Sequence, residues 1–162
     1  MVVEENWLHF DNQEYRLLAW VVMPNHVHLL VEIWQTPQAQ LVKDWKGFTA
    51  RRINRLLGRS GKLWQDDYWD RYIRDEAHYR KVVHYIEANP VKAGLVKTPE
   101  QWPFSSARFR DEYRRLNCPR NQASHDRSAD RRVRVFQNFG RRLADKAVRA
   151  PARHAPLRLA LR

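Results

Sequence analysis

Two strand-like segments separated by only two residues place the strongest constraint on the fold. Residues 15–23 (YRLLAWVVM) and 26–33 (HVHLLVEI) are rich in β-branched, aromatic and aliphatic side chains, with Pro24 and Asn25 between them. This composition is typical of buried strands, and Pro followed by Asn suits a type I or II turn. The pair therefore predicts a β-hairpin, although hairpins more often use primed turns that favour Asn-Gly. The chain is therefore expected to contain this antiparallel pair of strands.

Residues 37–57 form the first predicted helix. Apolar side chains recur there at helical spacing, and Gly58 follows as a stop signal. Basic side chains share the same segment, and we take Arg51, Arg52 and Arg55 as candidate contacts for nucleic-acid phosphates. A solvated helix face explains these charges equally well.

The next segment is expected to add two short strands, at residues 63–65 and 68–74, and a second helix over residues 75–88. Asp75 suits the N-cap of this helix, and Pro90 lies just beyond its end. This part of the chain therefore alternates segments predicted as strands with segments predicted as helices.

Charge divides the chain into two parts. The formal net charge is +12, but residues 1–106 hold 14 basic against 13 acidic side chains, whereas residues 107–162 hold 16 against 5. The second part also loses hydrophobic periodicity. We therefore predict one domain over residues 1–108 and a basic, largely irregular tail over residues 109–162, with one short helix at residues 135–148.

The arginines of this predicted tail are candidate contacts for the phosphates of a polyanion, because their charge has few acidic neighbours to offset it. A solvated, solubilising extension is the alternative. The candidates are Arg131, Arg132, Arg134, Arg141, Arg142 and Arg149.

Several classes of protein are disfavoured by what the sequence lacks. No apolar stretch approaches the roughly 18 residues of a membrane span, and the N-terminus does not resemble a signal peptide. We therefore expect a cytoplasmic protein without a membrane partner. Cys118 is the only cysteine, which excludes an intramolecular disulfide and a zinc site built on paired cysteines. A metal would have to bind to His, Asn, Asp or Glu.

A candidate metal pair lies on the second strand of the hairpin. His26 and His28 are two residues apart, so their side chains share one face of the sheet and both imidazoles can reach one ion. A His-x-His pair taken alone is more often incidental or simply hydrogen-bonded.

The second predicted helix carries further polar candidates. Tyr85 and Asn89 are four residues apart on one flank of an apolar stripe that includes Tyr79. If this helix crosses the sheet near His26 and His28, a phenol and an amide oxygen converge on two imidazoles. The alternative is an exposed helix edge at which Asn89 serves only as a C-cap. A phenol, with a pKa of about 10, attacks a phosphodiester poorly unless a cation polarises the phosphate.

Longer motifs carry a resemblance to a known family. Residues 19–30 (AWVVMPNHVHLL) resemble the HUH motif of single-strand transposases. Four later blocks resemble the REP-associated tyrosine transposases in order and spacing: LWQ with YWD at 63–70, IRDE at 73–76, HYIEANPVKAGLV at 84–96 and WPFSS at 102–106. Together these blocks cover residues 19 to about 108.

The resemblance implies an α+β fold in which helices pack on a compact antiparallel sheet, a ferredoxin-like or RRM-like HUH fold. It also implies a transposase that cleaves single-stranded, hairpin-forming DNA through a 5′-phosphotyrosine. Tyr85 matches the family's nucleophile, and His26, His28 and Asn89 match its metal ligands. The implied cofactor is a divalent metal. Imidazoles favour softer ions, whereas the amide and phosphate oxygens favour Mg or Mn, which we expect first.

The resemblance also has a gap, and other functions compete with it. Family members usually carry a further segment, with a sheet strand, before the equivalent of residues 2–10, so we expect an N-terminally short domain or a sheet completed differently. One competing function is a catalytically decayed nucleic-acid-binding module of the same fold. Another is a protein-interaction domain that uses the seven tryptophans.

Overall fold

A computed structural model describes residues 1–111, 116 and 132–139. Its helices and strands follow one another in an α+β order. They are α1 (Val2–Phe10), β1 (Tyr15–Val22), β2 (His26–Ile33), α2 (Gln38–Leu56), β3 (Trp69–Tyr72), α3 (Glu76–Glu87), α4 (Asn89–Lys92), the 3-10 turns η1 (Pro99–Gln101) and η2 (Ser106–Phe109), and β4 (Arg132–Phe139). The predicted α+β fold with an antiparallel sheet is therefore confirmed.

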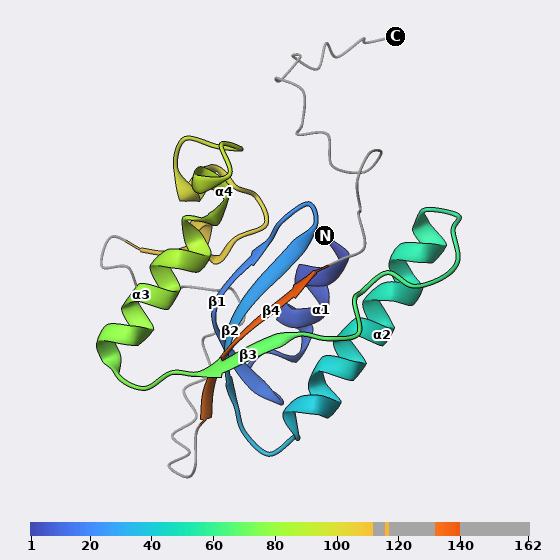
Figure 1. The fold of residues 1–162 in the computed structure, drawn as a ribbon, viewed down its shortest axis with the longest axis horizontal. Coiled ribbons are helices and arrows are strands. Elements are labelled where there is room, and N and C mark those ends of the chain that lie inside the picture. The colour runs from blue at the N-terminus through green and yellow to red at the C-terminus, as the bar shows by residue number, and fades with distance from the viewer. Residues whose placement is uncertain (112–115, 117–131, 140–162) are drawn as a thin grey trace, which may run out of the picture.

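The sheet has four strands in the order β1-β2-β4-β3, and every neighbouring pair is antiparallel. The hairpin of β1 and β2 confirms the first expectation from the sequence. Because β2 and β3 both run antiparallel to β4, they are parallel to each other and form a split β-α-β unit with α2. In Figure 1, α1 and α2 lie on one side of the sheet and α3 on the other.

The strand β4 corrects the prediction for the C-terminal part of the chain. Residues 135–139 belong to a strand and not to the predicted helix, and this strand lies between β2 and β3. The sheet therefore does not end at the predicted domain boundary near residue 108. The remainder of the predicted helix, residues 140–148, lies outside the described residues.

Alternation explains why this basic segment forms a strand. Val133 and Val135 pack on the α3 side of the sheet, while Phe136 packs on the α2 side. Val135 and Phe136 are both buried. Because the strand is covered on both faces, Val135 and Phe136 are successive apolar residues, and the two-residue alternation of a half-exposed strand is interrupted there. The arginines around this short apolar pattern led to the prediction of a basic tail.

Both helices predicted for residues 1–108 are confirmed, whereas one predicted short strand is wrong. The helix expected at residues 37–57 is α2, and the helix expected at 75–88 is α3, with the Asp75 side chain accepting a hydrogen bond from the His78 amide. The strand expected at 63–65 is wrong, since only Trp64 makes a bridge there.

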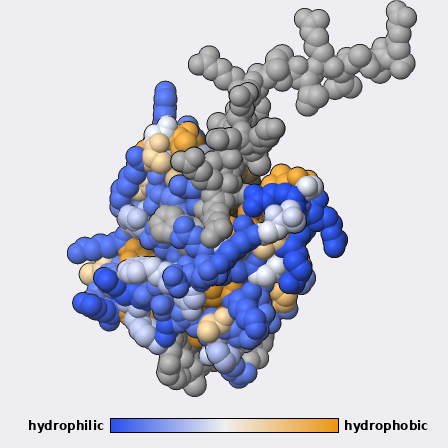
Figure 2. Space-filling view, turned by 45° about the vertical axis from the view of Figure 1, so that its right-hand side comes forward, coloured by the Kyte–Doolittle hydropathy of each residue, from blue (hydrophilic) through white to orange (hydrophobic). Residues whose placement is uncertain are grey.

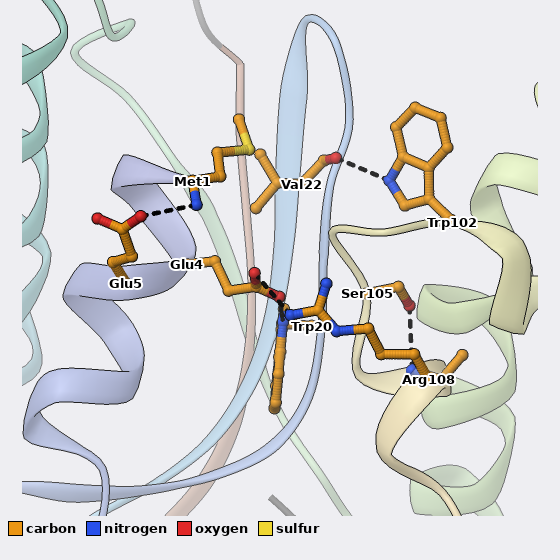
Figure 3. Close-up of polar contacts among 9 residues, drawn as sticks. Met1, Glu4, Glu5, Trp20, Val22, Trp102, Ser105 and Arg108 are labelled. Carbon is orange, nitrogen blue, oxygen red and sulfur yellow. Dashed lines mark hydrogen bonds and ion pairs between the residues drawn. The ribbon is translucent and has the colours of Figure 1, made fainter. Parts of the chain in front are cut away.

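Side-chain contacts fix α1 and the segment after α4 against β1 (Figure 3). Trp20 of β1 donates from its indole nitrogen to a Glu4 carboxylate oxygen at 2.8 Å, and Arg108 forms an ion pair with the other Glu4 oxygen at 3.0 Å. Trp102 donates to the Val22 carbonyl oxygen at 3.0 Å. These buried polar groups have partners, as low-dielectric surroundings require.

The surface is predominantly hydrophilic on the face that Figure 2 displays, where apolar areas are small and separate. No helix in the described ranges combines the length and apolar character needed to cross a membrane. The two apolar cores lie between the layers, one under α1 and α2 and one under α3.

The placement of β4 gives a prediction for stability. Phe136→Ala should lower the free energy of unfolding by about 3–5 kcal/mol, because it empties the space beneath Trp45 and Tyr68. Urea denaturation followed by tryptophan fluorescence measures the change. Leu56→Ala, at an exposed position of α2, is the control and should stay within about 0.5 kcal/mol of the parent. An equally small effect of Phe136→Ala would place β4 outside the sheet.

Candidate active site

The orientation of α3 follows from its apolar stripe. Tyr79, Val82, Val83 and Ile86 pack against the sheet, and Ile86 is fully buried. The neighbouring flank therefore turns Tyr85 toward β2. The rings of Tyr85 and His28 meet edge to face, with centroids 5.3 Å apart. Tyr85 is nevertheless 44% exposed, so its phenol is accessible to a ligand.

The two histidines occupy one face of β2, as their spacing predicted. Their ring centroids are 4.9 Å apart. Burial, and secondarily the charge of His26, lowers the pKa of His28 to about 4. Burial also lowers the pKa of His26, although a hydrogen bond with the Asn89 side chain opposes that shift. Both rings are therefore mainly neutral at neutral pH and can present a lone pair to a metal.

One atom of this group lacks a partner. His28 is only 2% exposed, and its Nε2 makes no hydrogen bond within the part of the chain that the structure describes. A buried ring nitrogen without a partner is unfavourable, and coordination to a cation would satisfy it. Among the described residues, no three His, Cys, Asp or Glu side chains gather to hold an ion. A metal site at His26 and His28 would therefore need another donor type, and the side chain of Asn89, which bonds to His26, is the candidate.

The structure adds a cation that the sequence analysis did not single out. Lys92 of α4 places its ammonium 4.8 Å from the centroid of the Tyr85 ring. Asn89 begins the same short helix, so α4 carries both the residue that bonds to His26 and the ammonium beside Tyr85. The signal in the sequence was the seven-residue spacing between Tyr85 and Lys92, which two turns of helix would bring to one side.

A buried polar cluster fixes the end of α3. Glu87 is 1% exposed and accepts hydrogen bonds from Ser106 Oγ at 2.6 Å and from Arg110 Nε at 2.8 Å. Arg110 also donates to the Leu18 carbonyl oxygen on β1 at 2.8 Å. The cluster thus ties the helix that carries Tyr85 to the neighbouring strand. The sequence analysis did not identify Glu87. Its position four residues after Val83 places this acidic side chain in line with the apolar stripe, which is the pattern that indicates a buried carboxylate.

The predicted phosphate-binding arginines whose side chains the structure describes lie away from the histidines. Arg51, Arg52 and Arg55 lie exposed on α2, across the sheet from α3, and Arg52 pairs with Glu5 at 3.2 Å. Arg134 pairs with Asp70 at 2.6 Å. For Arg132 the structure describes the backbone alone. Arg131, Arg141, Arg142 and Arg149 lie outside the described residues.

Comparison with known proteins identifies a family that this chain matches. The family model described as "Transposase IS200 like" matches residues 8–89. The chain is 34% identical over 97 residues to a REP-associated tyrosine transposase of Escherichia coli (strain K12), an alignment that covers 59% of this chain and 56% of the relative. It is 28% identical over 110 residues to a putative REP-associated tyrosine transposase of Haemophilus influenzae, covering 59% and 61%. The chain thus spans less than two thirds of the length of these relatives.

A solved structure has a similar fold over part of its chain. The structure of a REP-associated tyrosine transposase bound to a REP hairpin matches with a TM-score of 0.55 and 28% identity, over 65% of this chain and 63% of that chain. The match supports the fold derived above, including the layered α+β arrangement.

The buried cluster at the end of α3 gives a prediction. Arg110→Ala should lower the free energy of unfolding by about 3–5 kcal/mol, because it removes the guanidinium that pairs with the buried Glu87 carboxylate. Chemical denaturation measures the change. Arg80→Ala is the control: it removes the exposed ion pair with Glu76 on the same helix and should change stability by less than about 1 kcal/mol. Equal effects of the two substitutions would refute a structural role for the buried pair.

Proposed function

The chain belongs to the IS200-like transposase family, and from this premise we propose that it is a transposase that cleaves and rejoins single-stranded, hairpin-forming DNA. Tyr85 is the proposed nucleophile. The observation that carries this proposal is its position: an accessible phenol on α3 that meets the ring of a buried His28 on β2. Relatives named as REP-associated tyrosine transposases and a solved structure bound to a REP hairpin support the same substrate class.

In the proposed reaction the Tyr85 oxygen forms a bond to the scissile phosphorus. The 3′ oxygen of the preceding nucleotide leaves, so the products are a 5′-phosphotyrosine and a free 3′-hydroxyl. The phenol loses its proton to solvent, and the leaving 3′ oxygen takes up a proton from solvent. Attack by a 3′-hydroxyl on the phosphotyrosine reverses these bond changes and rejoins DNA. Lys92, beside the Tyr85 ring, would attract the phosphate to the nucleophile.

We further propose that His26, His28 and Asn89 bind a divalent metal ion, with Mg or Mn as the first candidates. The buried, partnerless Nε2 of His28 and the neutral state of both imidazoles support this ligand set. An ion bound there would supply charge stabilisation at the phosphate. The Glu87 cluster, which fixes the end of α3, would keep Tyr85 and Asn89 in place beside the histidines.

The arginine set remains a proposal for contacts with DNA phosphates. Such contacts position a nucleic acid and do not read its bases. Arg51, Arg52 and Arg55 on α2 would serve DNA that passes over the other side of the sheet. The proposed contacts on the C-terminal part are Arg131, Arg132, Arg134, Arg141, Arg142 and Arg149. Arg134 would have to share its guanidinium with Asp70.

The nucleophile can be tested by covalent capture. Tyr85→Phe should abolish the protein-DNA adduct and leave binding of a single-stranded hairpin nearly unchanged, because only the attacking oxygen is lost. A denaturing gel with labelled DNA measures the adduct. Tyr79→Phe is the control, since Tyr79 packs in the apolar stripe of the same helix. A full yield of adduct from Tyr85→Phe would assign the nucleophile elsewhere, and binding without any adduct from the unaltered chain would favour a decayed binding module.

The metal site has its own test. His26→Ala, His28→Ala and Asn89→Ala should each reduce cleavage by about tenfold or more, because each removes a proposed ligand. Saturating chelator should have the same effect on the unaltered chain, and added Mg or Mn should restore activity. Cleavage that persists undiminished in chelator would disprove the role of a metal, whatever the substitutions do.

A further inference from the structure

The edge strand β3 exposes two aromatic side chains. Trp69 is 48% exposed and Tyr72 is 45% exposed. Each ring lies beneath a guanidinium: Arg71 Cζ is 4.9 Å from the Trp69 centroid, and Arg134 Cζ is 3.7 Å from the Tyr72 centroid. Large aromatic side chains are usually buried, so two exposed rings on one short strand are candidates for contact with a ligand.

The two rings lie on opposite faces of the sheet. Side chains alternate along a strand, and positions three apart point in opposite directions. Arg71 pairs across the ladder with Val135, which packs in the core under α3, so Trp69 also faces α3. Tyr72 pairs with Arg134, whose neighbour Phe136 on the same face packs against Trp45 of α2.

Strand register aligns Trp69 with the proposed active site. Gln137 of β4 pairs with His28 on one side and with Trp69 on the other. The three residues therefore form a row across β2, β4 and β3 on the face that carries Tyr85. Two strand spacings separate the backbones of His28 and Trp69, or about 10 Å. This is the range of a nucleotide close to the scissile phosphate.

We propose that Trp69 and Arg71 form a stacking subsite for an unpaired nucleobase that flanks the phosphate attacked by Tyr85. The inference rests on the proposed function and adds a base-binding subsite to it. An exposed indole offers a flat surface to any base, and an arginine beside it can neutralise the adjacent phosphate. Stacking of this kind tolerates sequence changes, so the subsite selects unpaired over paired bases and does not read their identity.

A binding experiment on the full chain tests this subsite independently of catalysis. All variants carry Tyr85→Phe, and the probe is a labelled DNA hairpin with a single-stranded flank, compared with the same DNA made abasic at one flank position at a time. Trp69→Ala should weaken binding of the intact flank about tenfold or more. At one abasic position the loss should disappear, because the base that stacks is already absent.

Matched variants separate stacking from general effects. Tyr72→Ala removes an equally exposed aromatic ring from the same strand but from the opposite face, and should leave affinity unchanged. Trp69→Phe should retain most of the affinity, since it keeps an aromatic face. Equal losses from Trp69→Ala and Tyr72→Ala, or a loss that persists at every abasic position, would overturn the proposal. A change in oligomeric state without a change in DNA affinity would also overturn it, by making Trp69 a protein contact.

A second measurement needs no substitution at Trp69. A flank that carries 5-iodouracil at each position in turn is irradiated in the complex, and the crosslinked peptide is identified by mass spectrometry. Crosslinking to Trp69 from the position found in the abasic series supports the subsite, and crosslinks confined to other residues refute it. If cleavage by Tyr85 fails while these two results hold, the proposed activity is lost but the base-binding subsite stands.

Discussion

The attachment of α3 to the sheet is the constraint on which the rest of the candidate site depends. The apolar stripe sets which face of the helix meets the strands, and the Glu87 carboxylate sets its position along them, through Ser106 and Arg110. A buried carboxylate is tolerated only where its partners are in place, so this contact has little freedom to slide. A rotation of α3 by one residue, about 100°, would carry Tyr85 away from His28. The proposed chemistry therefore depends on a cluster that need not touch the DNA.

Local patterns in the sequence predicted much of this site. Strand spacing placed His26 and His28 on one face, and helical spacing placed Tyr85 and Asn89 on one flank. The convergence of the two pairs required knowing where α3 crosses the sheet, which the resemblance to a family implied and spacing alone could not. Glu87 was missed because its partners, Ser106 and Arg110, lie about twenty residues further along the chain.

The error at β4 has a similar origin. A strand that is paired on both sides and packed on both faces draws its stability from residues distant in the sequence, and composition reports only on the segment itself. Residues 132–139 lie in a strongly basic part of the chain, so charge indicated a tail. The same error prevented a prediction that Trp69 lies in register with His28, because the two residues are related through Gln137 of β4. Without that strand, no register relates β3 to the histidines.

The two faces of the sheet divide the proposed DNA contacts. Tyr85, His28 and Trp69 share the α3 face, whereas Arg51, Arg52 and Arg55 lie on α2, across the sheet. A nucleotide bound between Trp69 and Tyr85 cannot also contact α2, because the strands and the core of α2 lie between them. If the α2 arginines bind phosphates, those phosphates belong to DNA remote from the scissile bond, such as a paired stem that passes the edge of the sheet. The unpaired flank would then lie on one face and the stem would approach the other, which is an arrangement that a hairpin with a single-stranded extension can adopt.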